Sequence, residues 1–213
     1  MHAGAVVLAV DVDPRMIGIL QGRADLNDAR FVLGDALSFD YDANARDAWC
    51  ACGNLPYNVA TPLILRWLAL QYPPSRIVAM VQRDVALRLT ARPNTAAYGS
   101  LSVLVQFSMH VHRALALGPD AFYPRPRVES AVVTMERRNA PAVAVRDVAF
   151  FLQVVRGAFA YRRKTLVNSL ALALGIERLH TQRVLADIGL GNDTRAEQLD
   201  LDAFGAIADR LAA

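Results

Sequence analysis

Short apolar runs alternate with amphipathic segments through the first part of the chain. Apolar runs predict buried strands at residues 6–10, 29–33, 48–53 and 76–81. Helical periodicity between and after these runs predicts helices at 14–21, 61–71 and 84–90. Apolar strands that alternate with helices are typical of a parallel sheet covered on both faces. The pattern therefore predicts an α/β fold.

The pattern changes after these elements. Two further strands are predicted at 110–117 and 130–137, joined by a turn-rich connection, and this pair is expected to complete the sheet as an antiparallel edge. After a linker at 139–145, helices are predicted at 146–160, 165–174, 176–187 and 202–212. We therefore expect an α/β domain at 1–138 and a small all-helical domain at 146–213.

Polar residues follow three of the predicted parallel strands, at Asp11, Asp35 and Asn54. Ligands of open α/β sheets bind at the carboxyl ends of the strands, so we expect these side chains to line one crevice. An acid in the position of Asp11 commonly binds ribose hydroxyls, and Asp35 could accept a hydrogen bond from an adenine amino group. Taken singly, each acid is more often a helix cap or a solvated turn residue, but their shared position at strand ends favours a functional role.

The tetrapeptide Asn54-Leu55-Pro56-Tyr57 has a more specific chemistry. The N6 amino group of adenine is a poor nucleophile because its lone pair is delocalised into the ring. The Asn54 side-chain oxygen and the Leu55 carbonyl can accept its two hydrogens, and Pro56 biases Leu55 towards an extended backbone. Tyr57 offers a ring on which a flipped-out base stacks, worth about 1–3 kcal/mol. The alternative interpretation is a plain strand-to-helix turn.

Charge is distributed unevenly along the chain. Residues 51–170 hold 15 basic and 5 acidic side chains, whereas the segments on either side are net acidic. Of the 23 cations, 22 are Arg, which suits bidentate contact with phosphate. A basic central band is the footprint expected of a nucleic-acid-binding protein. The alternative is a solvated face of mixed charge.

Composition narrows the class of protein. An apolar fraction of 54% with 20% charged residues is typical of a globular chain, and no apolar run reaches the length of a membrane span. Cys50 and Cys52 are expected to lie on one face of a strand as small buried residues, since a zinc site needs more ligands. So few cysteines indicate a reduced, cytoplasmic protein.

Together these features resemble the ribosomal RNA adenine dimethylase family, and most closely its KsgA/RsmA branch. The resemblance runs from Ala5 to the C-terminus and rests on VDVDPRM at 10–16, GDAL at 34–37, NLPYN at 54–58, MVQRDVALRL at 80–89, YGSLSVLVQ at 98–106, FYPRPRVESAVV at 122–133, FAYRRKTLVNSL at 159–170 and TRAEQL at 194–199. It implies a Rossmann-like methyltransferase domain at 1–138 that uses S-adenosylmethionine, and an rRNA-binding helical domain at 146–213. The implied reaction is N6-dimethylation of two adjacent adenosines in the 3′-terminal hairpin of small-subunit (16S) rRNA during ribosome biogenesis.

By position, the resemblance makes Asp11 the ribose ligand of the cofactor and Asp35 the ligand of its adenine. Ala36 adds a backbone amide, and Asn54 touches both the cofactor and the target N6. Phe122 is similar to the family's second aromatic, which holds the target base against Tyr57. The alternative for Phe122 is a core aromatic.

Arg162, Arg163 and Lys164 fall in the family's basic motif at the start of a helix, which implies contact with RNA phosphates. The alternative is a solvated helix face. The implied partner is small-subunit rRNA in the pre-30S particle. We expect a monomer that uses neither a metal ion nor a membrane.

The sequence also departs from the family pattern. The family's glycine-rich loop follows its first strand, whereas the only G-x-G here, Gly189 to Gly191, lies in the helical tail. We therefore expect an N-terminally truncated form that lacks the first strand, its loop and the next helix. Three alternatives stay open, namely a large-subunit rRNA methylase of the macrolide-resistance type, a non-catalytic RNA-binding or ribosome-assembly factor, and a DNA adenine methylase.

Overall fold

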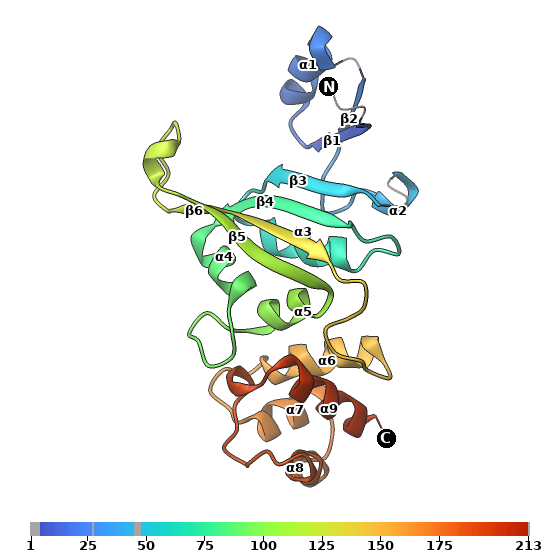
Figure 1. Ribbon diagram of the computed structural model, residues 1–213, viewed down its shortest axis with the longest axis vertical. Helices are drawn as coiled ribbons and strands as arrows, with labels where there is room; N and C mark the ends of the chain where they lie inside the picture. Colours follow the sequence, from blue (N-terminus) through green and yellow to red (C-terminus); the bar gives the residue numbers. More distant parts are fainter. Residues whose placement is uncertain (1–4, 27, 45–47, 213) are drawn as a thin grey trace. The chain divides into compact units, whose positions relative to one another are not determined.

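The computed structural model describes residues 5–26, 28–44 and 48–212. The chain divides into two compact units (Figure 1). The first comprises Met1–Asp47 with Pro62–Pro73, and the second comprises Ala48–Thr61 with Pro74–Ala213.

The first unit contains a parallel pair of strands, β1 (Val7–Asp11) and β2 (Ala29–Leu33), in register from Val7 opposite Ala29 to Asp11 opposite Leu33. Helix α1 (Pro14–Gln21) connects the two strands. Asp13 caps it by accepting the Arg15 backbone N–H at 2.9 Å, with Pro14 at its first position. The remaining helical elements are η1 (Ala24–Leu26), α2 (Tyr41–Asn44) and most of α3 (Ala60–Leu68).

An aromatic cluster stabilises the first unit. The buried Tyr41 ring meets Trp67 edge-on at 6.2 Å and Phe39 edge-on at 5.0 Å. The Arg66 guanidinium donates to the Phe39 carbonyl at 2.9 Å. These contacts fasten α3 against α2 and the segment that precedes it.

The second unit is built on a four-stranded sheet with the order β3–β4–β6–β5. Strand β3 (Cys50–Asn54) runs parallel to β4 (Arg76–Gln82), and β6 (Ser130–Arg137) lies antiparallel between β4 and β5 (Met109–Leu117). The predicted antiparallel edge is therefore confirmed. The pattern predicted one sheet, however, whereas the described strands form two. Within the described residues, β1 pairs with β2 alone and β3 pairs with β4 alone, so no strand joins the two sheets.

Helices α4 (Arg83–Thr90) and α5 (Ser100–Ser108) pack against this sheet. The alternation along β4 buries Ile77, Ala79 and Val81 in the core. No helix was predicted at the position of α5. Six of its nine residues are buried, so its sequence has no polar face to reveal the helical period.

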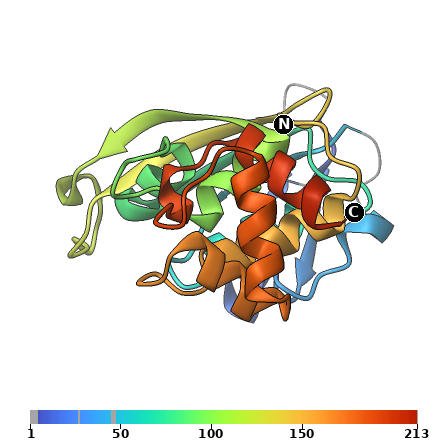
Figure 2. The same cartoon turned by 90° about the horizontal axis from the view of Figure 1, so that it is seen from below.

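The C-terminal segment is helical, as the pattern predicted. Its elements are α6 (Val148–Ala158), α7 (Leu166–Leu174), α8 (Arg178–Asp187), η3 (Ala196–Gln198) and α9 (Leu201–Leu211). They gather into one group beyond α5 (Figures 1 and 2). None of the helices in the described part of the chain has the length and hydropathy that crossing a membrane requires.

Ring contacts and hydrogen bonds fasten the C-terminal helices to the rest of the second unit. The rings of Phe107 in α5 and Phe151 in α6 stack at 4.5 Å. The Tyr98 hydroxyl donates to the Leu199 carbonyl at 2.8 Å in a buried setting. Burial raises the pKa of Tyr98 above its usual range, so this donor keeps its proton. The division at 1–138 and 146–213 stays a prediction.

The substitution Tyr98→Phe is expected to lower the free energy of unfolding by about 1–3 kcal/mol, because it leaves the Leu199 carbonyl without its donor. Urea denaturation measures this change. Tyr161→Phe, at a tyrosine that is 42% exposed, serves as the control and should change the free energy by less than about 0.5 kcal/mol. Equal effects from the two substitutions would contradict the importance of this hydrogen bond.

Candidate functional site

Strand β3 delivers Asn54 to the surface. Its alternation places Cys50, Cys52 and Asn54 on an exposed face and buries Ala51 between them. The Leu55 backbone N–H donates to the Met80 carbonyl at 3.0 Å, and the Leu55 side chain is buried. The backbone around Asn54 is thus fixed while its side chain stays accessible.

Both cysteines were expected to be buried, and this expectation is wrong. Cys50 and Cys52 do share one face of the strand, but it is the exposed face. The apolar run at 48–53 does not show which face of the strand is covered. Within the described residues, no group of three His, Cys, Asp or Glu side chains is placed to hold a metal ion.

The turn after β3 leaves two acceptors free. The Pro56 carbonyl accepts the backbone N–H groups of Val59 and Ala60, each at 3.0 Å, and so starts α3. Among the described residues, neither the Asn54 side chain nor the Leu55 carbonyl has a hydrogen-bond partner. Two oxygen acceptors that are adjacent in the chain are therefore available to an external donor.

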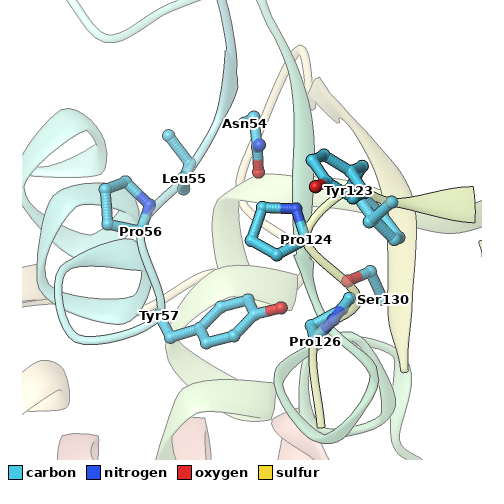
Figure 3. A pocket seen from close by; sticks show the side chains of 9 residues that line it. Asn54, Leu55, Pro56, Tyr57, Tyr123, Pro124, Pro126 and Ser130 are labelled. Atoms are coloured by element: carbon cyan, nitrogen blue, oxygen red, sulfur yellow. The ribbon is translucent and has the colours of Figure 1, made fainter. Parts of the chain in front are cut away.

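This turn forms one wall of a pocket of about 320 Å³ (Figure 3). The connection between β5 and β6 forms the other wall. The lining residues are Asn54, Leu55, Pro56, Tyr57, Phe122, Tyr123, Pro124, Pro126 and Ser130. The structure thus brings the predicted tetrapeptide and the predicted Phe122 into one pocket.

Aromatic rings flank the pocket without closing it. Tyr57 is 44% exposed, and Phe122 is half-buried. Within the described part of the chain, these two rings make no direct stacked or edge contact. Both rings therefore line the pocket without covering each other.

Hydrogen bonds and ion pairs position the β5–β6 connection. The Arg83 backbone N–H donates to the Glu129 carbonyl at 3.0 Å, and the two side chains form an ion pair at 2.8 Å. Asp120 and Arg125 form a second ion pair at 3.2 Å. Both pairs are more than half exposed, so each contributes at most about 1 kcal/mol. The backbone pairing of β6 is therefore the stronger constraint on this wall.

Four pocket residues were not predicted as site residues, namely Tyr123, Pro124, Pro126 and Ser130. They lie in the stretch FYPRPRVES, which the sequence analysis used only for its resemblance and for Phe122. The two prolines signalled a turn there. The pairing of β6 with β4, which brings Ser130 into the pocket, is a long-range contact without a local signal.

The first unit holds the other acidic candidates. Asp11 Oδ1 accepts the Asp13 backbone N–H at 2.8 Å, and the Asp11 carbonyl accepts the Gly34 backbone N–H at 2.9 Å. Asp35 Oδ1 accepts the Leu37 backbone N–H at 2.8 Å. Among the described residues, the second oxygen of each carboxylate has no partner. Both acids therefore lie at the carboxyl edge of the β1–β2 pair with acceptor capacity to spare.

The roles predicted for Asp11, Asp35 and Ala36 stay predictions. So does the expectation that the two acids and Asn54 line one crevice, because the acids belong to the first unit and Asn54 to the second.

The basic motif precedes α7. Arg162, Arg163 and Lys164 are exposed in the connection from α6, just before Thr165 at the N-cap position of α7. Within the described residues, none of the three forms an ion pair. Arg162 and Lys164 also line a second cavity of about 600 Å³, together with Arg88. Their predicted contact with RNA phosphates stays a prediction.

Comparison with known proteins gives consistent matches. The family model "Ribosomal RNA adenine dimethylase" matches residues 5–213. The "Ribosomal RNA small subunit methyltransferase A" of Pelotomaculum thermopropionicum is 42% identical over 95% of this chain and 73% of its own. The protein of the same name from Bacillus licheniformis is 38% identical over 96% of this chain and 74% of its own.

Two solved structures share the fold. A dimethyladenosine transferase from Plasmodium falciparum has a TM-score of 0.75 at 20% identity and covers 94% of this chain and 80% of its own. The 23S rRNA methyltransferase ErmE has a TM-score of 0.68 at 18% identity and covers 97% and 82%, respectively. At these identities the two structures support the predicted α/β methyltransferase fold with its helical C-terminal part.

The exposure of the β3 face is tested with a thiol reagent. Ellman's reagent is expected to titrate both Cys50 and Cys52 in the folded protein, because both side chains are exposed. The variants Cys50→Ser and Cys52→Ser assign each reaction. A thiol that reacts only after denaturant is added would show that the face is covered.

Proposed function

The chain belongs to the ribosomal RNA adenine dimethylase family, and we propose that it dimethylates N6 of two adjacent adenosines in the 3′-terminal hairpin of small-subunit rRNA, with S-adenosylmethionine as methyl donor. The observation that carries the proposal is the pocket that joins Asn54-Leu55-Pro56-Tyr57 to Phe122. Two relatives named as small-subunit enzymes are 42% and 38% identical to this chain over most of its length. This similarity favours the small subunit.

The free acceptors of the pocket suit an amino group. The Asn54 side-chain oxygen and the Leu55 carbonyl accept the two N6 hydrogens of an adenine. These hydrogen bonds draw N6 away from planarity and direct its lone pair out of the ring plane. Because the Leu55 N–H is bonded to Met80 and its side chain is buried, the carbonyl needs little reorganisation to act.

The rings and prolines of the pocket suit a flat base. A pocket that is mainly apolar with a few polar groups is typical of a small-molecule or base site. Tyr57 and Phe122 contact the two faces of an adenine that has left its RNA stack, and each contact is worth about 1–3 kcal/mol. The base is thereby held with N6 towards Asn54.

The acids of the first unit fit a nucleoside donor. The unpartnered carboxylate oxygens of Asp11 and Asp35 accept ribose hydroxyls and an adenine amino group, respectively, and the Ala36 backbone amide contributes beside Asp35. When bound, S-adenosylmethionine supplies a methyl group activated by its sulfonium. None of the described residues that line the pocket has an imidazole or a carboxylate, so the proton of N6 leaves to solvent. Catalysis therefore rests on positioning.

Phosphate contacts hold the RNA. Arg162, Arg163 and Lys164 are exposed, and Arg88 lines the same cavity as two of them. Cations in such a cluster displace counterions from RNA and make binding salt-dependent. This surface belongs to the same unit as the base pocket.

The variant Asn54→Ala is expected to lower kcat for methyl transfer by about 10²–10³-fold, since it removes one of the two acceptors for N6. The assay is transfer of radiolabelled methyl groups onto small subunits that lack this modification. Asn58→Ala, at an exposed asparagine outside the pocket, is the matched control and should keep its activity. Full activity of Asn54→Ala would contradict the mechanism, and label on large subunits alone would contradict the substrate.

Stacking on Tyr57 gives a separate prediction. Tyr57→Ala should lower kcat/KM by about 5- to 150-fold, the equivalent of about 1–3 kcal/mol, because the base loses the ring that stacks on one of its faces. Tyr57→Phe keeps the ring and should retain most of the activity. Equal losses from the two substitutions would assign the role to the hydroxyl group instead of the ring.

A further inference from the structure

Ser130 is a buried polar residue at the wall of the base pocket. It is the first residue of β6, is 3% exposed and lines the pocket. Its backbone is paired on both sides, opposite Gln82 of β4 and Leu117 of β5. The position of its side chain is therefore set by the sheet.

The Ser130 hydroxyl differs from the other buried hydroxyls. Four polar residues are buried in the described part of the chain, and three of them donate to backbone carbonyls. These three bonds are Ser102 to Arg88 at 2.6 Å, Ser169 to Gly157 at 2.9 Å and Thr181 to Glu177 at 3.1 Å. Ser130 Oγ has no partner among the described residues.

A buried hydroxyl without a partner is costly, by about 1–3 kcal/mol, unless something reaches it. Among the described residues, two side-chain polar atoms are both fully enclosed and without a partner, namely Arg66 Nε and Trp67 Nε1. Ser130 Oγ is not one of them, so a ligand in the pocket can reach it. Figure 3 shows the Ser130 hydroxyl turned towards Pro124 and the Tyr57 ring. The hydroxyl therefore faces the space that the proposed base occupies.

We propose that the Ser130 hydroxyl donates a hydrogen bond to a ring nitrogen of the target adenine. This assignment rests on the proposed function and makes Ser130 a base-binding residue. Asn54 and Leu55, on the opposite wall, offer oxygen acceptors to N6, while Ser130 offers a donor to the ring. Donor and acceptors on opposite walls fix the rotation of the base within its plane, which stacking alone leaves free.

A chemical double-mutant cycle tests this assignment. Small subunits are reconstituted with rRNA that carries adenosine, 1-deazaadenosine, 3-deazaadenosine or 7-deazaadenosine at the target position, and kcat/KM is measured for the wild-type protein and Ser130→Ala. On adenosine, Ser130→Ala is expected to lose about 5- to 30-fold, the equivalent of about 1–2 kcal/mol. On one of the three analogues, the two proteins should react at equal rates, because the partner nitrogen is absent.

The control variant is Ser169→Ala, which removes a buried hydroxyl that donates to the Gly157 carbonyl outside the pocket. It should lower stability but show the same ratio to wild type on every RNA. Urea denaturation checks that Ser130→Ala is folded. If Ser130→Ala is fully active, or its loss is the same on all four RNAs, the assignment is wrong. If the wild-type protein transfers no methyl group to adenosine, the proposed function is contradicted together with it.

Discussion

The pairing of β4 with β3 on one side and β6 on the other is the constraint on which the pocket depends. Met80 lies opposite both Asn54 and Val132, so the end of β3 and the start of β6 meet at the same edge of the sheet. A slip of one residue would turn Asn54 into the core and Ala51 out of it. The buried alternation of Ile77, Ala79 and Val81 opposes such a slip.

The same pairing explains how the short turn between β3 and α3 can present hydrogen-bond acceptors to a ligand. The Leu55 N–H donates to Met80 and the Leu55 side chain is buried in the core, while the Leu55 carbonyl has no partner among the described residues. Pro56 has no N–H to offer, and its carbonyl begins α3. The turn therefore presents two acceptors without any charged group, and the backbone holds one of them, the Leu55 carbonyl, in place. This suits the recognition of a neutral amino group.

Local chemistry allowed much of the fold to be predicted from the sequence. The helical period at 14–21 predicted α1, and the local pattern at 130–137 predicted β6, since these signals lie within the elements they specify. The apolar α5 gave no period, and the run around Cys50 did not show which face of β3 is covered. The two separate sheets were not predicted either, because the pairing of strands depends on contacts between residues far apart in the sequence.

The site residues divide in the same way, into those with a local sequence signal and those placed by long-range contacts. Asn54, Leu55, Pro56 and Tyr57 were predicted because the tetrapeptide is contiguous and its chemistry is specific, and Phe122 was predicted from the family resemblance. Ser130 enters the pocket through the pairing of β6 with β4, a long-range contact that gives no local signal of its role. A serine near a strand start is common, and its distinction here is burial without a partner.

The central claim is that the pocket between the β3–α3 turn and the β5–β6 connection receives the target adenine. Photocrosslinking tests it most directly, with 8-azidoadenosine at the target position of the small-subunit rRNA and mass spectrometry of the crosslinked peptides. The account predicts crosslinks within 54–57 and 122–130, the segments that line the pocket. Crosslinks confined to the basic segment at 162–164, with none in the pocket, would contradict it.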